Sequence, residues 1–198
     1  MPAEPGDRAA IDATDEPVLT AWRVITGPPS AGKTSVIEAL AARGHRTVPE
    51  SARAHIAALG HRPEAIAADG GLRVAIQQGI ARRQRGVELD LRPDEPLFLD
   101  RALPDSIAYF QRAGLSVEPL VADVRRRRYR RVFYLEGLPL DRDGLRFEDD
   151  GEAAALGEAI LAAYAMLDYF VVRVPAYAGD AVEVAVQRRV ELILSMVG

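Results

Sequence analysis

The sequence predicts an α/β fold in which helices cover both faces of a parallel β-sheet. Short apolar runs alternate along the chain with longer segments of helical character, and this alternation is typical of a parallel sheet. With 198 residues, 48% of them hydrophobic and 27% charged, the chain suits one globular domain with a sizeable core. Residues 1–20 are acidic and rich in Pro and Ala, so we expect a mobile tail there and one domain over residues 21–198.

The first half of the domain is expected to alternate strands and helices. Residues 22–26 form an apolar run that leads directly into a glycine-containing loop, as a first strand would. A helix should follow and end at Gly44. Its expected apolar face consists of Val36, Ile37, Leu40 and Ala41. The next expected elements are a strand at 46–49, helices at about 51–60 and 72–90, and a buried strand at 96–100.

The second half continues the alternation. Pro104 and Asp105 are placed to open a helix and Gly114 to end it. A further helix, a strand at 132–135, a polar loop at 138–150, a helix at 151–167, a strand at 169–174 and a last helix follow. The apolar residues of that last helix are Val182, Val186, Val190 and Ile193. In such folds ligands bind beyond the carboxyl ends of the strands. Thr26, Glu50, Asp100 and Glu136 are expected there.

Composition excludes several classes of function. A net charge of -4 and a pI near 5.5 argue against a dedicated nucleic-acid binder. The run of arginines at 125–131 is expected at the C-terminus of a helix, where the helix dipole favours cations. The chain has no cysteine, which excludes disulfides and thiolate zinc sites. Without a targeting segment or a long apolar run, we expect a cytoplasmic protein that does not insert into membranes and that binds a small molecule. The oligomeric state stays open.

The segment Gly27-Pro28-Pro29-Ser30-Ala31-Gly32-Lys33-Thr34 matches the phosphate-binding pattern G-x-x-x-x-G-K-[ST] between a predicted strand and a predicted helix. Glycines let backbone amides approach phosphates, and the N-terminus of a helix adds positive charge. Lys33 would contact the outer phosphates, and the Thr34 hydroxyl suits magnesium. The predicted phosphate-binding residues are Gly27, Ser30, Ala31, Gly32, Lys33, Thr34 and Ser35. An ordinary glycine-containing turn is the alternative.

The basic residues single out the same loop. Of the 25 basic residues, 24 are arginines, and the only lysine is Lys33. A compact ammonium group differs from a planar guanidinium in size and hydrogen-bonding geometry, so lysine stands where that chemistry is needed. The same count leaves no N-K-x-D segment of the kind that recognises guanine. We therefore expect ATP with Mg²⁺, and GTP stays open.

Two carboxylates are candidates for the acceptor side of the site. Asp100 ends an apolar strand and precedes Arg101, so it can hold the hydration shell of magnesium or accept a proton, while the guanidinium neutralises charge on the phosphoryl group. Glu50 follows the second strand, and Arg53 lies close enough in sequence to face the same acceptor. Helix capping is the alternative for both carboxylates, and which of them is the general base stays open.

A polar stretch after the fourth strand contains Arg142 and Arg146. A mobile lid there would bring arginines over the phosphates and exclude water, which favours phosphoryl transfer over hydrolysis. A solvated loop is the alternative.

These pieces together resemble the AAA-type family of small P-loop ATPases and kinases that includes the ribosylnicotinamide kinase domain of NadR proteins. The resemblance covers about residues 22–196 and is carried by residues 25–35, 48–53, 98–106, 131–136 and 143–146. It implies the P-loop NTPase fold of the nucleoside and nucleotide kinases, with a five-stranded parallel sheet of order 2-3-1-4-5. Asp100-Arg101 is similar to the acidic-Arg unit at the third strand of those kinases, and Glu50 to the acidic residue after their second strand.

We therefore expect an ATP-dependent phosphotransferase that moves the γ-phosphoryl group of Mg-ATP to a hydroxyl of a small molecule, of the nucleoside or nucleoside-like class. Lys33, Glu50, Asp100 and Arg101 are the expected catalytic residues. The alternative is a nucleotide-dependent binding module or ATPase that switches conformation for a protein or lipid partner. A ring-forming AAA motor fits less well, because no Asp-Glu pair follows the third strand.

Overall fold

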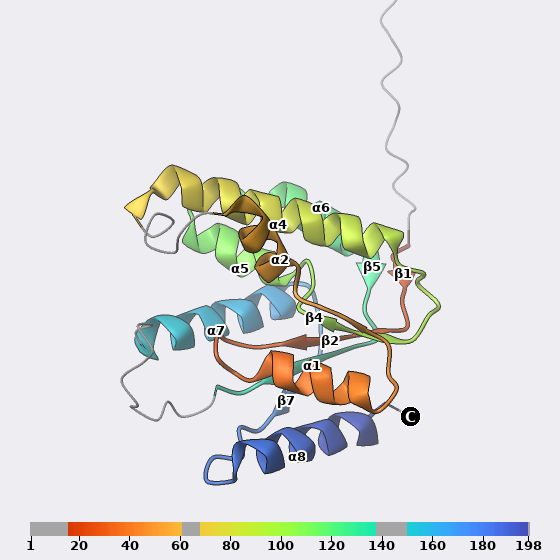
Figure 1. The fold of residues 1–198 in the computed structure, drawn as a ribbon. Helices are drawn as coiled ribbons and strands as arrows, with labels where there is room; N and C mark the ends of the chain where they lie inside the picture. Colours follow the sequence, from red (N-terminus) through yellow and green to blue (C-terminus); the bar gives the residue numbers. More distant parts are fainter. Residues whose placement is uncertain (1–15, 61–67, 138–149, 198) are drawn as a thin grey trace, which may run out of the picture.

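The computed structural model describes residues 16–60, 68–137 and 150–197. Five parallel strands form its main sheet: β2 (Trp22–Thr26), β3 (Thr47–Val48), β4 (Leu97–Asp100), β6 (Arg131–Leu135) and β7 (Val171–Val174). Their spatial order is β3-β4-β2-β6-β7, which is 2-3-1-4-5 when these five strands are counted along the chain (Figure 1). The predicted fold class is confirmed.

Helices lie on both sides of this sheet (Figure 1). One side carries α1 (Lys33–Ala42) and α8 (Val182–Ser195), which contact each other. The other side carries α2 (Ser51–Leu59), α4 (Gly70–Asp90), α5 (Asp105–Arg112), α6 (Glu118–Arg125) and α7 (Asp150–Met166). Among the described residues, no helix combines the length and the apolar character that crossing a membrane requires.

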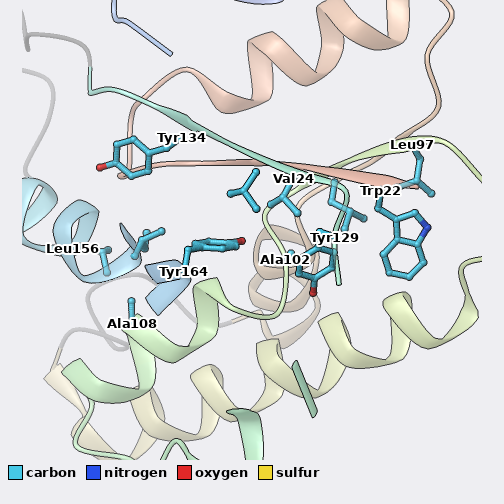
Figure 2. Packing of buried hydrophobic residues seen from close by; sticks show 12 residues of the cluster. Trp22, Val24, Leu97, Ala102, Ala108, Tyr129, Tyr134, Leu156 and Tyr164 are labelled. Atoms are coloured by element: carbon cyan, nitrogen blue, oxygen red, sulfur yellow. The ribbon is translucent and has the colours of Figure 1, made fainter. Parts of the chain in front are cut away.

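Alternating side chains of the strands build two separate cores. On one face of the sheet, Val24, Leu97, Leu99 and Val132 pack with Ile160 and Tyr164 of α7. Figure 2 shows Val24, Tyr129 and Tyr164 in this layer, between the sheet and the helices. On the opposite face, Ile25, Phe98 and Phe133 pack with Val36 and Leu40 of α1 and Val190 of α8. Because successive side chains of a strand point to opposite faces, one apolar run can supply both cores.

The structure differs from the predicted boundary of the tail. Residues Val18–Leu19 form a short strand, β1, which pairs in parallel with β5 (Arg127–Arg128). The backbone of Thr20 also donates a hydrogen bond to the Arg128 carbonyl. The part of the predicted tail before residue 16 lies outside the described residues.

The arginine run is not simply a solvated helix end. Arg128 donates to the carbonyls of Leu167 and Asp168 after α7, and Arg131 donates to the Met196 carbonyl after α8. The carbonyl groups at the end of a helix have no partner within the helix, and cations are favoured beside them. These two strand residues therefore close the C-terminal ends of α7 and α8.

Two helical glycines should respond in opposite ways to replacement by alanine. A Cβ atom at Gly157 of α7 would lie 2.5 Å from the Tyr134 hydroxyl and 3.3 Å from Pro28 Cβ, whereas a Cβ at Gly86 of α4 would meet nothing within 4 Å. We expect Gly157→Ala to lower the free energy of unfolding by about 1–3 kcal/mol through overpacking. Gly86→Ala should raise it by about 0.5–1 kcal/mol, since alanine is the better helix former.

Urea denaturation of the two variants beside the parent protein measures both effects. If the free energy of unfolding changed by the same amount and in the same direction in both variants, the close approach of α7 to the phosphate loop would be contradicted.

Candidate active site

A cleft of about 1160 Å³ lies where the strands of the main sheet end. Its wall includes residues 29–35 after β2, residues 50–52 after β3, residues 101–102 after β4 and residues 177–180 after β7. Helices α2, α4, α5, α7 and α8 supply the rest, through residues such as Ile56, Gln84, Tyr109 and Arg189. Four strands thus deliver the segments that follow them to one place, as expected for a parallel sheet.

The loop between β2 and α1 has the backbone conformation of a phosphate cradle. Gly27, Ser30 and Gly32 have φ angles of 142°, 59° and 75°, and Gly32 is the residue that caps α1. Such left-handed positions turn successive backbone amides toward a common centre, which is where an anion binds. Residues 30–35 line the cleft. Gly27 is buried behind the loop, and a Cβ atom there would collide with the Leu135 carbonyl oxygen.

Lys33 is buried at the first turn of α1, and its Nζ donates to the Pro28 carbonyl at 2.6 Å. Burial and the charge of Arg101 together lower the pKa of this ammonium group to about 7, against the opposing effect of Asp100. The ammonium form of Lys33 therefore lacks enough negative charge beside it. A phosphate group supplies that charge, since an anion close to an ammonium group stabilises its protonated form.

Asp100 is buried at the end of β4. Burial raises the pKa of its carboxyl group to about 6, and the negative charge of Glu50 acts in the same direction, while Lys33 opposes both. Its Oδ1 is buried without a hydrogen-bond partner among the described residues. A buried carboxylate oxygen without a donor is a ligand that a hard cation or its water can use.

Arg101 connects the two carboxylates that follow β3 and β4. Its Nε donates to Glu50 Oε1 and its Nη1 donates to Asp105 Oδ1, both at 3.0 Å. The guanidinium carbon also lies 5.8 Å from the centre of the Tyr109 ring. Arg101 has a φ of 67°, an unusual conformation for a residue with a side chain. Such a conformation costs about 1–3 kcal/mol and persists only where its surroundings enforce it.

Asp105 is the residue that enforces it. Its Oδ1 accepts from the Thr26 hydroxyl at 2.5 Å as well as from Arg101, and its Oδ2 accepts from the backbone of Ala102 at 3.2 Å and the Tyr164 hydroxyl at 2.6 Å. Four donors from four positions in the chain thus meet on one buried carboxylate. Sequence analysis assigned Asp105 only the opening of a helix and missed this role.

Arg189 is the second residue that sequence analysis missed. It is a buried residue of α8 that donates to the carbonyls of Pro175, Ala31 and Glu136, at 2.8, 2.7 and 2.9 Å. It therefore ties the phosphate loop to the segments after β6 and β7. The sequence gives one sign of this role. Arg189 lies four positions after Ala185 and four before Ile193, so it shares a helical face with apolar residues.

The other predicted residues fall outside this cluster. Glu136 lies at the end of β6 with its carboxylate 3.7 Å from Arg173, and it is not among the residues that line the cleft. Arg53 belongs to α2, but its side chain lies outside the described part, as do Arg142 and Arg146. In the described ranges, no group of three or more His, Cys, Asp or Glu side chains is arranged to hold a metal ion.

Comparison with known proteins agrees with this geometry. The family model described as an AAA domain matches residues 22–183. The chain belongs to this AAA-domain family. Among curated protein sequences, none matches it.

Several solved structures have the same fold as this AAA-domain protein. A NadR protein in complex with NR superposes with a TM-score of 0.67 at 16% identity, over 90% of this chain and 51% of that one. A NadR protein in complex with NAD and AMP-PNP gives a TM-score of 0.61 at 16% identity, over 90% and 50%. This chain spans about half the length of those NadR chains.

A second kind of solved structure, a deoxyadenosine kinase, is similar in length to this chain. Deoxyadenosine kinase from M. mycoides, with the products dCMP and dCDP bound, gives a TM-score of 0.60 at 15% identity over 88% of this chain and 96% of that one. Both kinds of structure share the P-loop fold, and the predicted family resemblance is confirmed.

Replacing Asp105 tests its structural role in the AAA-domain protein. Asn presents an amide N–H₂ group to donors that now meet an oxygen, so Asp105→Asn should lower the free energy of unfolding by roughly 2–4 kcal/mol. The matched control is Asp94→Asn, which removes the partner of Arg92 in an exposed pair and should leave the urea midpoint unchanged. A midpoint of Asp105→Asn equal to that of the control would refute the role of Asp105.

Proposed function

We propose that this AAA-domain protein is a kinase that transfers the γ-phosphoryl group of Mg-ATP to a hydroxyl of a nucleoside or nucleoside-like molecule. One observation carries the proposal: a phosphate loop and a carboxylate–arginine pair line the same cleft. Lys33 belongs to the phosphate loop, and Glu50 and Arg101 belong to the segments that follow β3 and β4. In a kinase, such a pair can hold the acceptor hydroxyl and neutralise charge on the transferred group.

The cleft is large enough for two ligands, and its wall differs from end to end. The phosphate loop continues into residues 177–182 and α8, which gives space for the nucleotide. Beyond Glu50, the wall is formed by α2, α4 and α5, with Ile56, Ile80 and Tyr109 among its residues. Apolar and aromatic walls of this kind suit the flat ring of a nucleoside. The structures of the NadR and deoxyadenosine kinase proteins, with nucleoside-type ligands bound, support this choice of acceptor.

Glu50 is the better placed of the two candidate bases. It lines the cleft, and Arg101 Nε holds its Oε1, which leaves Oε2 for the acceptor. In the proposed reaction Glu50 takes the proton of the acceptor hydroxyl as that oxygen bonds to the γ-phosphorus, and the bond from the γ-phosphorus to the bridging oxygen breaks to release ADP. Lys33, the loop amides and Arg101 stabilise the negative charge on the transferred group.

The residues around Asp100 fit a magnesium ion. Mg²⁺ keeps several waters and binds one or two carboxylates together with the phosphates of its substrate, so it needs no cage of many acidic residues. Asp100 Oδ1 is a buried oxygen without a donor among the described residues, and Thr34 lines the cleft at the start of α1. We assign these two residues to the ion or its hydration shell. The ion itself would neutralise charge between the β- and γ-phosphates.

Nucleotide binding should draw a proton from solution. In the free protein the pKa of Lys33 is about 7, so at about pH 8 most molecules carry a neutral amine. Phosphates favour the ammonium form and raise this pKa, so binding takes up a proton, and the number taken up should rise toward about one as the pH increases above 7.

Calorimetric titration with a non-hydrolysable ATP analogue in buffers of different ionisation enthalpy measures this uptake. The control is Lys33→Arg, whose guanidinium stays charged throughout and should abolish the increase. Proton uptake that is the same in both proteins would assign it to a group other than Lys33.

The decisive test of the function is release of ADP from Mg-ATP, without acceptor and with ribonucleosides, deoxynucleosides, nicotinamide riboside and aminoglycosides in turn. We expect turnover that depends on one nucleoside-like class, and a loss of roughly 10² to 10³ in rate for Lys33→Ala. Turnover that is independent of every acceptor would refute the kinase proposal and favour an ATPase or a nucleotide-dependent binding module.

A further inference from the structure

Arg189 of α8 is a buried cation whose hydrogen bonds go to neutral groups. Its Nη1, Nη2 and Nε donate to the backbone carbonyls of Ala31, Glu136 and Pro175. Its exposed fraction is 2%, and none of the described carboxylates forms an ion pair with it. A buried charge costs free energy unless it is paired. Its place in the wall of the cleft therefore indicates a role beyond packing.

The contact with Ala31 holds one peptide group of the phosphate loop. The Ala31 carbonyl oxygen lies 2.7 Å from Arg189 Nη1, and Ala31 itself is fully buried. The peptide bond to Gly32 is trans, so the Gly32 N–H points in the direction opposite to that carbonyl. Gly32 lines the cleft, and its N–H donates to no acceptor among the described residues. Arg189 therefore holds the carbonyl side of a peptide group whose N–H has no partner.

The backbone at Gly32 does not fix this peptide group by itself. Gly32 has a φ of 75°, and glycine adopts positive and negative φ about equally readily. The peptide between Ala31 and Gly32 can thus rotate at little steric cost on its glycine side. A rotated peptide would present the Ala31 carbonyl to the cleft, and the negative end of that dipole repels an anion. A side chain that holds the carbonyl removes this alternative.

We propose that Arg189 is a positioning residue for phosphate binding, which keeps the Gly32 N–H directed at the phosphate group of a nucleotide. Arg189 itself acts through the backbone and does not touch the ligand. This inference rests on the part of the proposed function in which the loop binds phosphate, and not on transfer of the phosphoryl group to an acceptor.

The shape of a guanidinium group explains why an arginine stands at this position. Its donors lie in one plane in a fixed fork, whereas an ammonium group is a single point and an amide group has only two N–H bonds. Arg189 reaches Pro175 as well as Ala31, and residues 177–180 after Pro175 line the same cleft as the phosphate loop. One planar group thus sets the phosphate loop and this neighbouring segment relative to each other.

The first experiment measures binding of inorganic triphosphate to the full chain by calorimetry. This probe has no base or sugar, so it reports on the phosphate loop alone. Arg189→Met keeps a side chain of similar length and removes the donors. We expect it to bind triphosphate roughly ten- to a hundredfold more weakly, the value of a hydrogen bond to a charged group.

Arg43→Met is the matched control. Arg43 also connects α1 to α8, through Gln187 and Glu191, but it lies outside the residues that line the cleft. Its replacement should leave the affinity for triphosphate unchanged. An equal loss of affinity in Arg43→Met and Arg189→Met would assign the effect to the packing of α8 on α1 and would overturn the inference.

The second experiment follows the amide proton of Gly32 by NMR. In the parent protein, saturation with triphosphate should move this proton downfield, because it gains a hydrogen bond to a charged oxygen. The same shift should be much smaller in Arg189→Met at saturation. A role in packing alone would lower the urea midpoint of Arg189→Met and leave its shift and its affinity equal to those of the parent protein.

The outcomes separate this inference from the proposed function. A Gly32 amide proton that does not move in the parent protein overturns the inference even if Arg189→Met fails to fold. Unchanged affinity in Arg189→Met also overturns it, and both results leave the kinase intact. If triphosphate binding depends on Arg189 but no acceptor supports release of ADP, the kinase is refuted and the inference stands.

Discussion

The buried carboxylate of Asp105 is the constraint on which the position of Arg101 and Glu50 depends. It joins the end of β2, the segment after β4 and helix α7 through Thr26, Arg101 and Tyr164. Breaking one partner of a buried ion pair is strongly destabilising, because the other charge remains in a place that water cannot reach. The left-handed backbone of Arg101 is therefore maintained by the same contacts that hold the sheet to α7, and the guanidinium meets Glu50 in a preset orientation.

Two ionisable groups near this carboxylate, Lys33 and Asp100, are shielded from water and are not fully balanced by opposite charges. Burial shifts the pKa of Lys33 downward and that of Asp100 upward, which means that both groups are harder to ionise than in water. In the proposed function, a triphosphate would bring negative charge to Lys33 and magnesium would bring positive charge to Asp100. Both groups would then ionise more readily than in the unliganded protein, and preorganised charges of this kind are what phosphoryl transfer requires.

The parts of this site that the sequence predicts are those encoded by neighbouring residues. The phosphate loop, the strand before it and Asp100-Arg101 are short, continuous patterns, so the fold class followed from them, and the family resemblance that they carry implied the strand order. Asp105 and Arg189 act through partners as far away as Thr26 and Ala31, 79 and 158 positions along the chain. No local periodicity reveals such contacts. Strand β1 was missed for a related reason, since two residues carry no alternation.

In the proposed kinase, chemistry and acceptor selectivity would reside in different layers of the fold. The phosphate loop, Asp100 and Arg101 are attached to the central sheet, whose strands are buried on both faces. The proposed acceptor wall belongs to α2, α4 and α5. Helices α2 and α4 pack against each other where the His55 ring lies over Gly79, and Glu88 joins α4 to the sheet side through Leu103. Residues such as Gln77 and Ile80 can therefore change without disturbing the loop that binds phosphate. Glu88 is more constrained, because its carboxylate links α4 to the backbone of the segment that carries Arg101.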